Sequence, residues 1–422
     1  MFSLNQLYKR FNEEYGRHPS LTVSSPGRLD FLNTHQDYKG LPVVSIGVNL
    51  RTYTAIAPAE GSRAEILSFN MKDEGRAYVD TFELDSIRLE QPSWFGNYLR
   101  ASLIALNEKG LKVGGFKAAI YSEVPVGGGL GSSAALTVSF IGGVNELFKL
   151  SLSKKDIAEL AYHAEHDIMG IPCGRLDQYG STFGKILKIE TRPPYNVEEL
   201  TLDEGLFIIL DSGIKHSTAE IHPKRQEEIN LGLKILLDAP EIPHNLRAKL
   251  GKTYYETLWD EISEEEIKPY IKKIPEESKK RIEFTIKEQK STTLALKIIK
   301  GELPDKETII NTLGNKWKKR VEEAFSSENV KLKLVGIIMD QQHQLLRDLY
   351  DLSLPEIESI RNSAIKAGAI GAKISGAGLG GSIVALSDNI KAAERILAEG
   401  IRSGAKRGWI AKVDTGIRKE QT

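Results

Sequence analysis

The chain has 422 residues, 41% of them hydrophobic and 27% charged, which is an ordinary balance for a globular protein. Its 57 basic and 57 acidic residues cancel, so net charge gives no argument for binding nucleic acid or an anionic membrane. The single cysteine, Cys173, excludes an intrachain disulfide and a cysteine-based zinc cluster. No apolar run reaches membrane-spanning length, and residues 1–10 predict an amphipathic helix, not a signal peptide. These features predict a cytoplasmic protein of two or three domains, with neither nucleic acid nor membrane as a partner.

The first strand is predicted at residues 21–25, and a cluster of polar residues follows it. Six polar residues fall within residues 26–40, between two strand-like runs: Arg28, Asp30, Asn33, His35, Asp37 and Lys39. Polar side chains on a loop held by a rigid sheet often form a binding site. A solvated loop is the alternative, because Asn, Asp and Gly are ordinary turn residues.

A helix is predicted over residues 93–106, with Trp94 at its start. Trp94 can be a core residue or an aromatic platform for a base. The sequence alone leaves both interpretations open.

Residues 115–147 predict a strand, a glycine-rich loop and a helix. The loop carries four glycines and two serines: Gly127, Gly128, Gly129, Gly131, Ser132 and Ser133. Glycines let a backbone approach an anion closely, and the free N–H groups of a helix start bind phosphate. A serine near the N-cap can serve the backbone, a phosphate or a metal. The stretch therefore favours a phosphate-binding loop over a plain flexible turn, although it lacks the Walker A pattern.

Two carboxylates flank a predicted break between helices. Residues 156–169 are strongly helical, and residues 172–180 predict a turn into a new helix. Glu165 and Asp177 lie on either side of that turn. Such a pair can serve a metal and a base in one pocket. Without other evidence, a surface helix charge is the favoured interpretation for each.

A second domain is predicted to open at the buried-type strand of residues 205–211, which divides the chain into domains 1–204 and 205–422. Near its end, Gly376, Gly378 and Gly381 match G-x-G-x-x-G. A strand follows at residues 382–386 where a dinucleotide site needs a helix. The stretch therefore predicts a glycine-rich hairpin that can pack flat against another loop or a ligand.

Three stretches in fixed order, residues 26–40, 125–135 and 373–381, resemble the GHMP kinases, and among these the galactokinases. The resemblance covers nearly the whole chain except residues 303–334 and parts of 238–280. It implies an α+β protein of two GHMP kinase domains with the active site in the cleft between them. It also implies a kinase that uses ATP and Mg²⁺ to phosphorylate the anomeric hydroxyl of galactose or a related sugar, with no obligatory protein partner evident.

The resemblance implies a role for each matching residue. Asp177 would be the catalytic base and Arg28 its cationic neighbour, while Ser133 and Glu165 would hold Mg²⁺. Sugar contacts would come from Thr34, His35, Asp37, Gly174 and His222, and ATP contacts from Trp94, Gly127, Gly128, Gly129, Gly131, Ser132 and Ser133.

Two pocket positions depart from the galactokinase pattern. Thr34 replaces a glutamate that in the family reaches toward C6 of the sugar, and His222 stands about where a tyrosine is usual. One interpretation is that Thr34 bonds O6 and galactose remains the substrate. The other is a C6-modified sugar such as galacturonate, because losing a carboxylate removes repulsion and His222 or Lys39 could add attraction.

Two further functions compete with the sugar kinase. A galactokinase-like sensor would bind sugar and ATP without catalysis, and another GHMP kinase would phosphorylate mevalonate or homoserine. A pure sensor has no need for Asp177, Arg28, Glu165 and Ser133 together, so the sequence favours an enzyme.

Overall fold

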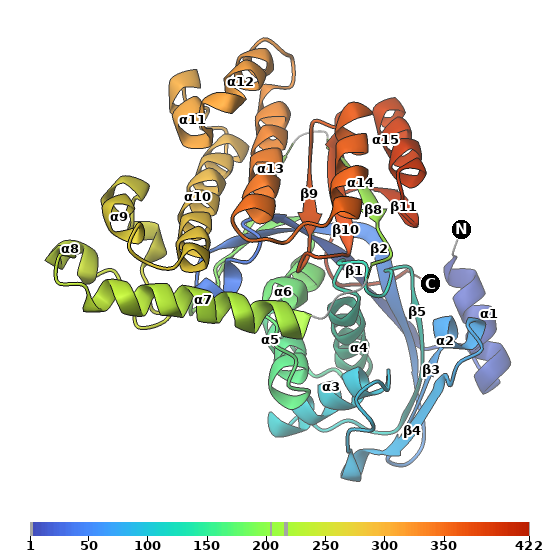
Figure 1. Ribbon diagram of the computed structural model, residues 1–422. Helices are drawn as coiled ribbons and strands as arrows, with labels where there is room; N and C mark the ends of the chain where they lie inside the picture. Colours follow the sequence, from blue (N-terminus) through green and yellow to red (C-terminus); the bar gives the residue numbers. More distant parts are fainter. Residues whose placement is uncertain (1–2, 203–204, 215–217, 422) are drawn as a thin grey trace.

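The computed structural model describes residues 3–202, 205–214 and 218–421 of the chain. It contains two lobes, one built on an eight-stranded sheet and the other on a four-stranded sheet with many helices (Figure 1). The predicted α+β class is confirmed. No helix among the described residues is long and apolar enough to cross a membrane.

The N-terminal lobe is organised around a mixed sheet in the order β12-β1-β2-β5-β3-β4, with β6 on β2 and β7 on β6. Its strands are β1 (Leu21–Leu32), β2 (Val43–Pro58), β3 (Arg63–Ser68), β4 (Val79–Glu83), β5 (Phe116–Ser122), β6 (Ile186–Ile189), β7 (Val197–Leu200) and β12 (Arg418–Lys419). Its helices are α1 (Leu4–Tyr15), α2 (Phe69–Asp73), α3 (Asn97–Glu108), α4 (Ser132–Phe148), α5 (Lys154–His163) and α6 (Leu176–Phe183).

Alternation along β2 explains why helices cover both faces of this sheet. Ala55 and Ala57 point to one face, where they join Phe11 of α1 in a small core. Ile56, between them, points to the other face and packs in the core that includes Val138 of α4. Successive side chains of a strand point to opposite faces, so one strand supplies two cores.

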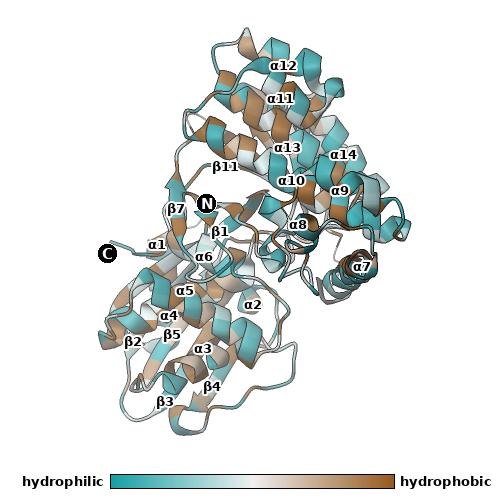
Figure 2. Ribbon diagram, turned by 90° about the vertical axis from the view of Figure 1, so that its left-hand side faces the viewer, coloured by the Kyte–Doolittle hydropathy of each residue, from teal (hydrophilic) through white to brown (hydrophobic). Residues whose placement is uncertain are grey.

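The C-terminal lobe carries an antiparallel sheet in the order β11-β8-β10-β9. Its strands are β8 (Leu206–Asp211), β9 (Gly371–Ser375), β10 (Ser382–Ser387) and β11 (Arg407–Ala411). Its helices are α7 (Thr218–Asp238), α8 (His244–Arg247), α9 (Glu264–Ile271), α10 (Glu276–Ile299), α11 (Lys306–Leu313), α12 (Lys318–Phe325), α13 (Val330–Asp348), α14 (Pro355–Lys366) and α15 (Ile390–Arg402). Figure 2 shows brown hydrophobic residues beside teal hydrophilic ones on these helices, as amphipathic packing requires.

One hydrophobic core runs through both lobes. Phe31 of β1 meets Phe207 of β8 edge to face, with ring centroids 5.7 Å apart. Residues 303–334 add Ile309, Trp317 and Val321 to this same core. The division of the chain near residue 205 stays a prediction, and β12 returns from the end of the chain to pair with β1.

The expectation that residues 26–40 form a loop is wrong for its first half. β1 continues to Leu32, so Arg28 and Asp30 lie on a buried strand. The pairing of β1 with β2 is irregular between Pro26 and Arg28 and again between Asp30 and Leu32. Such bulges re-aim side chains without ending a strand, which makes a polar stretch with Pro and Gly look like a loop in sequence.

Candidate active site

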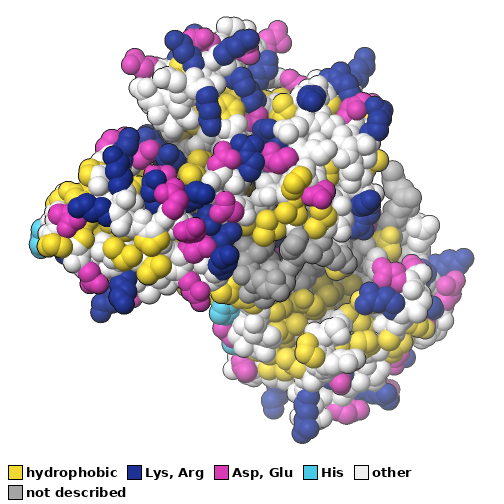
Figure 3. All heavy atoms as spheres, viewed as in Figure 1, with side chains coloured by type: hydrophobic (Ala, Val, Ile, Leu, Met, Phe, Trp, Pro, Cys, Tyr) yellow, Lys and Arg dark blue, Asp and Glu magenta, His cyan; other side chains and the backbone are white. Residues whose placement is uncertain are grey.

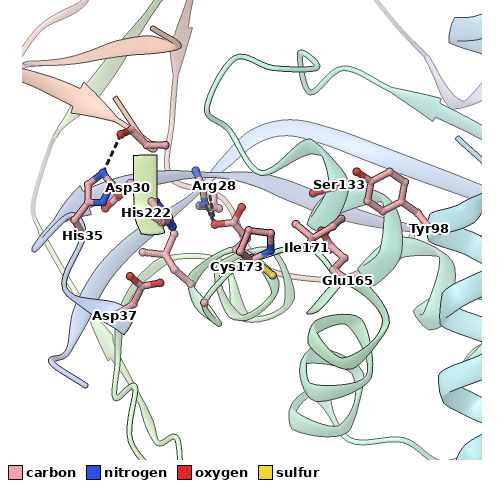
Figure 4. Close-up of a pocket in the computed structure, with 16 residues that line it drawn as sticks. Arg28, Asp30, His35, Asp37, Tyr98, Ser133, Glu165, Ile171, Cys173 and His222 are labelled. Carbon is pink, nitrogen blue, oxygen red and sulfur yellow. Dashed lines mark hydrogen bonds and ion pairs between the residues drawn. The ribbon is translucent and has the colours of Figure 1, made fainter. Parts of the chain in front are cut away.

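A cavity of about 290 Å³ lies between the lobes. Eight of the predicted site residues line it: Arg28, His35, Asp37, Ser133, Glu165, Gly174, Asp177 and His222. In Figure 4 the cavity has two ends, with His35, Asp37 and His222 at one and Ser133 and Glu165 at the other. Figure 3 shows a hollow between the lobes and mixed acidic and basic side chains over the helical lobe.

Arg28 and Asp177 form an ion pair in the middle of the cavity. The Arg28 Nε and Nη2 atoms donate to Asp177 Oδ1 at 2.8 and 2.5 Å. The third guanidinium nitrogen, Nη1, donates to the carbonyl of Gly129 at 2.6 Å. Asp177 lies in the first turn of α6, where a carboxylate also gains from the helix dipole. Arg28 thus ties the carboxylate to the glycine-rich loop.

The glycine-rich loop has the geometry of an anion site. Gly127, Gly129 and Gly131 all have positive φ, and α4 begins at Ser132 directly after them. Gly129 also packs so closely on the carbonyl of Ser375 that a Cβ would lie 2.6 Å from that oxygen. The glycine-rich loop therefore packs against the backbone of Ser375 and leads directly into the N-terminus of α4. Helix N-termini are common binding sites for phosphate.

The predicted glycine-rich hairpin is confirmed, and it packs against this loop. β9 and β10 pair antiparallel across residues 376–381. The hydroxyl of Ser382 donates to the carbonyl of Gly128 at 2.5 Å. Hairpin and loop together join the C-terminal lobe to the end of the cavity that lies at the glycine-rich loop.

Glu165 and Ser133 face each other beside the glycine-rich loop. Glu165 is buried, and burial raises the pKa of its carboxyl to about 7, against hydrogen bonds from Ser133, Gln178 and Thr137. Thr137 Oγ1 and Gln178 Nε2 each donate to its Oε1 at 3.1 Å. Keeping this buried carboxylate ionised costs free energy, and a cation bound beside it would offset that cost.

His35 and Asp37 enter the cavity from the second half of the polar cluster. His35 Nε2 lies 2.9 Å from the carbonyl of Ala377, and burial lowers the pKa of the imidazole well below its usual value. The neutral ring therefore donates from Nε2 to that carbonyl. Asp37 packs directly on the backbone of Gly174, where a Cβ would overlap its carboxylate. Burial raises the pKa of Asp37.

Thr34 does not line the cavity. It is buried, its hydroxyl accepts a hydrogen bond from Lys373 Nζ at 2.6 Å, and it donates to Asp30 Oδ1 at 3.1 Å. The hydroxyl thus already donates one hydrogen bond to a neighbour and accepts one from another. Asp30, which sequence reasoning did not place in the site, lines the cavity instead.

Asp30 is held firmly on its strand. Ser375 Oγ accepts from its backbone N–H at 3.0 Å, and Lys373 Nζ donates to its carbonyl at 3.1 Å. Only 6% of the residue is exposed, and burial raises the pKa of its carboxyl against the nearby Lys373 and Arg28. Its place two residues after Arg28 was a usable signal, since alternate residues of a strand share a face.

His222 lies in α7 against the same polar cluster. Its ring packs on His35 and Tyr38, with centroids 5.0 and 5.3 Å apart, and burial lowers its pKa.

Lys39 behaves otherwise. It is fully buried beneath Tyr350 and does not line the cavity, so the expectation that it could attract a C6 carboxylate is wrong.

The other sequence-predicted ATP residues lie around the cavity rather than in its lining. Trp94 packs on Phe95, with ring centroids 4.7 Å apart, just before α3. Gly127, Gly128, Gly129, Gly131 and Ser132 belong to the loop above. Tyr98 and Cys173 line the cavity without having been predicted. Tyr98 lies in the first turn of α3, which begins at Asn97, after Trp94.

Family models match three parts of the chain. The N-terminal domain of GHMP kinases matches residues 97–185, and the C-terminal domain of GHMP kinases matches residues 327–406. The galactokinase galactose-binding signature matches residues 9–58. These spans contain the glycine-rich loop with Glu165 and Asp177, the hairpin, and the polar cluster.

Relatives with known names agree. The chain is 26% identical to a galactokinase of Roseiflexus sp. (strain RS-1), over 92% of this chain and 88% of that protein. It is 28% identical to a galactokinase of Pyrococcus furiosus, over 93% of this chain and 96% of that protein. The crystal structure of Lactococcus lactis galactokinase complexed with galactose shares the fold, with a TM-score of 0.78 and 22% identity over 99% of this chain and 100% of that one. The chain thus matches both GHMP kinase domain models and the galactokinase galactose-binding signature, and it is a galactokinase-like sugar kinase that uses ATP.

Proposed function

We propose that this protein transfers the γ-phosphoryl group of ATP to the anomeric hydroxyl of galactose or a closely related neutral sugar. The observation that carries the proposal is the Arg28–Asp177 pair, which is joined to the glycine-rich loop through Gly129 and faces a polar cavity. The galactokinase relatives and the galactose-binding signature support the same acceptor.

Asp177 is the catalytic base in this proposal. Its carboxylate takes the proton of the anomeric hydroxyl as that oxygen bonds to the γ-phosphorus, while the bond to the bridging oxygen breaks and ADP leaves. Arg28 orients the carboxylate and neutralises charge on the phosphoryl group in transfer. Phosphoryl transfer needs positioning and charge neutralisation more than covalent help, and this pair supplies both.

Mg²⁺ fits the other end of the cavity. Glu165 offers one buried carboxylate and Ser133 one hydroxyl, beside the loop that would hold the phosphates. Mg²⁺ commonly takes one or two protein oxygens and fills its remaining positions with phosphate and water. The ion would supply charge neutralisation at the phosphates, and its charge would favour the ionised form of Glu165.

The lining favours a neutral sugar over a uronic acid. Asp30, Asp37, Glu165 and Asp177 all line the cavity, against a single arginine. The Thr34 hydroxyl is bonded to Asp30 and Lys373, and Asp30 lines the cavity in its place. The side of the site expected to face C6 therefore still carries an acidic group. A C6 carboxylate brought into this lining would meet like charges in a desolvated place.

An ATP-consumption assay of the purified protein with Mg²⁺ tests the proposal. The acceptors are galactose, galacturonate, N-acetylgalactosamine, glucose, arabinose and mevalonate. We expect a neutral sugar to be turned over fastest and its product to be the 1-phosphate. Preference for galacturonate would overturn the neutral-sugar assignment, and preference for mevalonate would overturn the sugar assignment. ATP binding without any turnover would favour the sensor.

A further inference from the structure

A second cavity, of about 400 Å³, adjoins the first. Asp37, Pro172, Cys173, Gly174 and His222 line both, so the two meet at the side of the site away from Ser133 and Glu165. None of the sequence motifs explains this second cavity. Its distinctive feature is aromatic, since Tyr38, Tyr162, Tyr195, Tyr254 and Tyr255 all contribute to its lining.

The aromatic wall is held in place by Arg175. The guanidinium carbon lies 3.9 Å from the ring centre of Tyr162 and 3.8 Å from that of Tyr195. Glu159 fixes the guanidinium, accepting from Nε at 2.9 Å and from Nη2 at 3.2 Å. Tyr254 lines the same cavity and lies edge-on to Tyr38, with ring centroids 5.7 Å apart. A surface ordered before binding loses little entropy when a ligand arrives.

The chemistry of the wall selects a neutral ring with an apolar face and polar edges. Its basic side chains are already paired, Arg175 with Glu159 and His166 with Asp167 at 2.8 Å. Tyrosine presents a flat apolar face and a hydroxyl at its rim, and two χ angles make it cheap to order. A sugar ring, with C–H groups on its faces and hydroxyls at its edge, matches such a surface.

The position of the junction decides how such a ring would be attached. The anomeric hydroxyl must stand at Asp177, which lines the first cavity and not the second. The second cavity begins at Asp37, Gly174 and His222, so a group in it hangs from another ring carbon. We propose that the acceptor is a neutral disaccharide with a free anomeric hydroxyl, whose second ring binds against Tyr195 and Tyr254.

This inference rests on the proposed function and leaves its chemistry unchanged. The anomeric oxygen of the reducing ring bonds to the γ-phosphorus, the bond to the bridging oxygen breaks, and the proton passes to Asp177. The product is a disaccharide 1-phosphate and ADP.

The test compares galactose with 1,3- and 1,4-linked galactobioses in the ATP-consumption assay, with methyl galactoside as the control whose anomeric oxygen is blocked. We expect one galactobiose to have a KM about tenfold below that of galactose, the gain that stacked aromatic contacts give. Tyr254→Ala should raise that KM about tenfold and change kcat/KM for galactose less than about twofold. Tyr254→Phe should restore the disaccharide KM, because the ring is retained.

The outcomes separate this inference from the proposed function. Turnover of galactose, with galactobioses neither turned over nor inhibitory, would overturn the second ring and leave the sugar kinase intact. Equal loss for galactose and galactobiose in Tyr254→Ala would show a general structural effect and would also overturn it. Failure of every sugar would remove the proposed function, and this inference with it.

Discussion

Two sets of charged residues lie within this site and behind it, and their surroundings differ. Arg28 and Asp177 face the cavity and bond to each other at 2.5 Å. Lys39 and Glu288 lie deeper, fully buried, and neither the Lys39 Nζ atom nor either Glu288 carboxylate oxygen has a hydrogen-bond partner among the described residues.

The surroundings of the deeper pair disfavour the charged form of each group. Lys39 Nζ lies 4.8 Å from the ring centre of Phe284 and 4.6 Å from that of Tyr350, and burial lowers its pKa well below the usual value. Burial likewise raises the pKa of Glu288 well above its usual value, although Lys373 and Lys39 oppose the shift. The comparison teaches that burial alone does not identify function. Charges that meet a cavity with partners can do chemistry, whereas charges without partners behind it reduce stability.

The largest effect is expected from Asp177→Asn. It removes the base but keeps the shape, so kcat should fall by about 10³ while the KM for ATP changes little. Steady-state ADP release measures both. Asp260→Asn, at an exposed position in the C-terminal lobe, is the matched control. Retained kcat in Asp177→Asn would remove this residue from the chemistry and weaken the contrast between the two sets.

Glu165→Gln should act on the metal instead. Losing one carboxylate ligand should raise the Mg²⁺ concentration for half-maximal rate by about tenfold or more, with activity recovered at excess Mg²⁺. A titration of rate against Mg²⁺ at saturating ATP measures this. An unchanged Mg²⁺ requirement would argue that Glu165, like Glu288, is only a buried acid.

Asp30→Asn should alter acceptor choice. We expect the ratio of kcat/KM for galactose to that for galacturonate to fall about tenfold, because the variant loses a charge-assisted hydrogen bond to a sugar hydroxyl and a repulsion toward a carboxylate. Thr34→Val is the control, since Thr34 is buried beside Asp30 but does not line the cavity. An equal shift in both variants would mean that the network, not Asp30, sets the preference.

The double variant Lys39→Met/Glu288→Met is expected to have the smallest effect on catalysis and a clear effect on stability. Replacing these buried groups, which lack hydrogen-bond partners, by apolar side chains should raise the free energy of unfolding by about 1–4 kcal/mol at neutral pH. Native Glu288 keeps a proton that the unfolded chain releases, so the wild type should lose stability as pH rises above 4.5, its usual pKa. For Lys39, with a lowered pKa, stability is lost as pH falls below 10.5.

Denaturant unfolding at several pH values measures these slopes, and the double variant should flatten both. Lys279→Met/Glu276→Met is the control, because that pair is a helix-surface ion pair at 3.2 Å and should change stability by less than about 0.5 kcal/mol. A double variant at Lys39 and Glu288 that is less stable than wild type would show that the buried pair is stabilising.

Sequence predicted the parts of the site that are local. The glycine-rich loop before α4 and the hairpin between β9 and β10 follow from glycine spacing and strand patterns. The approach of Arg28 to Asp177 spans 149 residues, and only family resemblance suggested it. No local pattern encodes a contact between a strand and a helix that lie so far apart along the chain.

Burial set by distant segments defeated the remaining expectations. Asp30 was named in the polar cluster, but the family resemblance assigned it no role in the site, and irregular pairing made its strand look like a loop. Lys39 looked available to a ligand, yet Phe284 and Tyr350 from the C-terminal lobe cover it. A side chain whose surroundings come from far along the chain is invisible to periodicity.

The return of β12 to β1 has a consequence for biosynthesis. Val23 and Ser24 pair with Lys419 and Arg418, and Arg51 Nη1 donates to Asp414 at 2.8 Å. During synthesis on the ribosome, the β1 edge of the first sheet therefore has no partner strand until the whole second lobe has been made. Unpaired edges recruit other chains, so versions truncated before residue 412 should aggregate during expression even though every catalytic group is present.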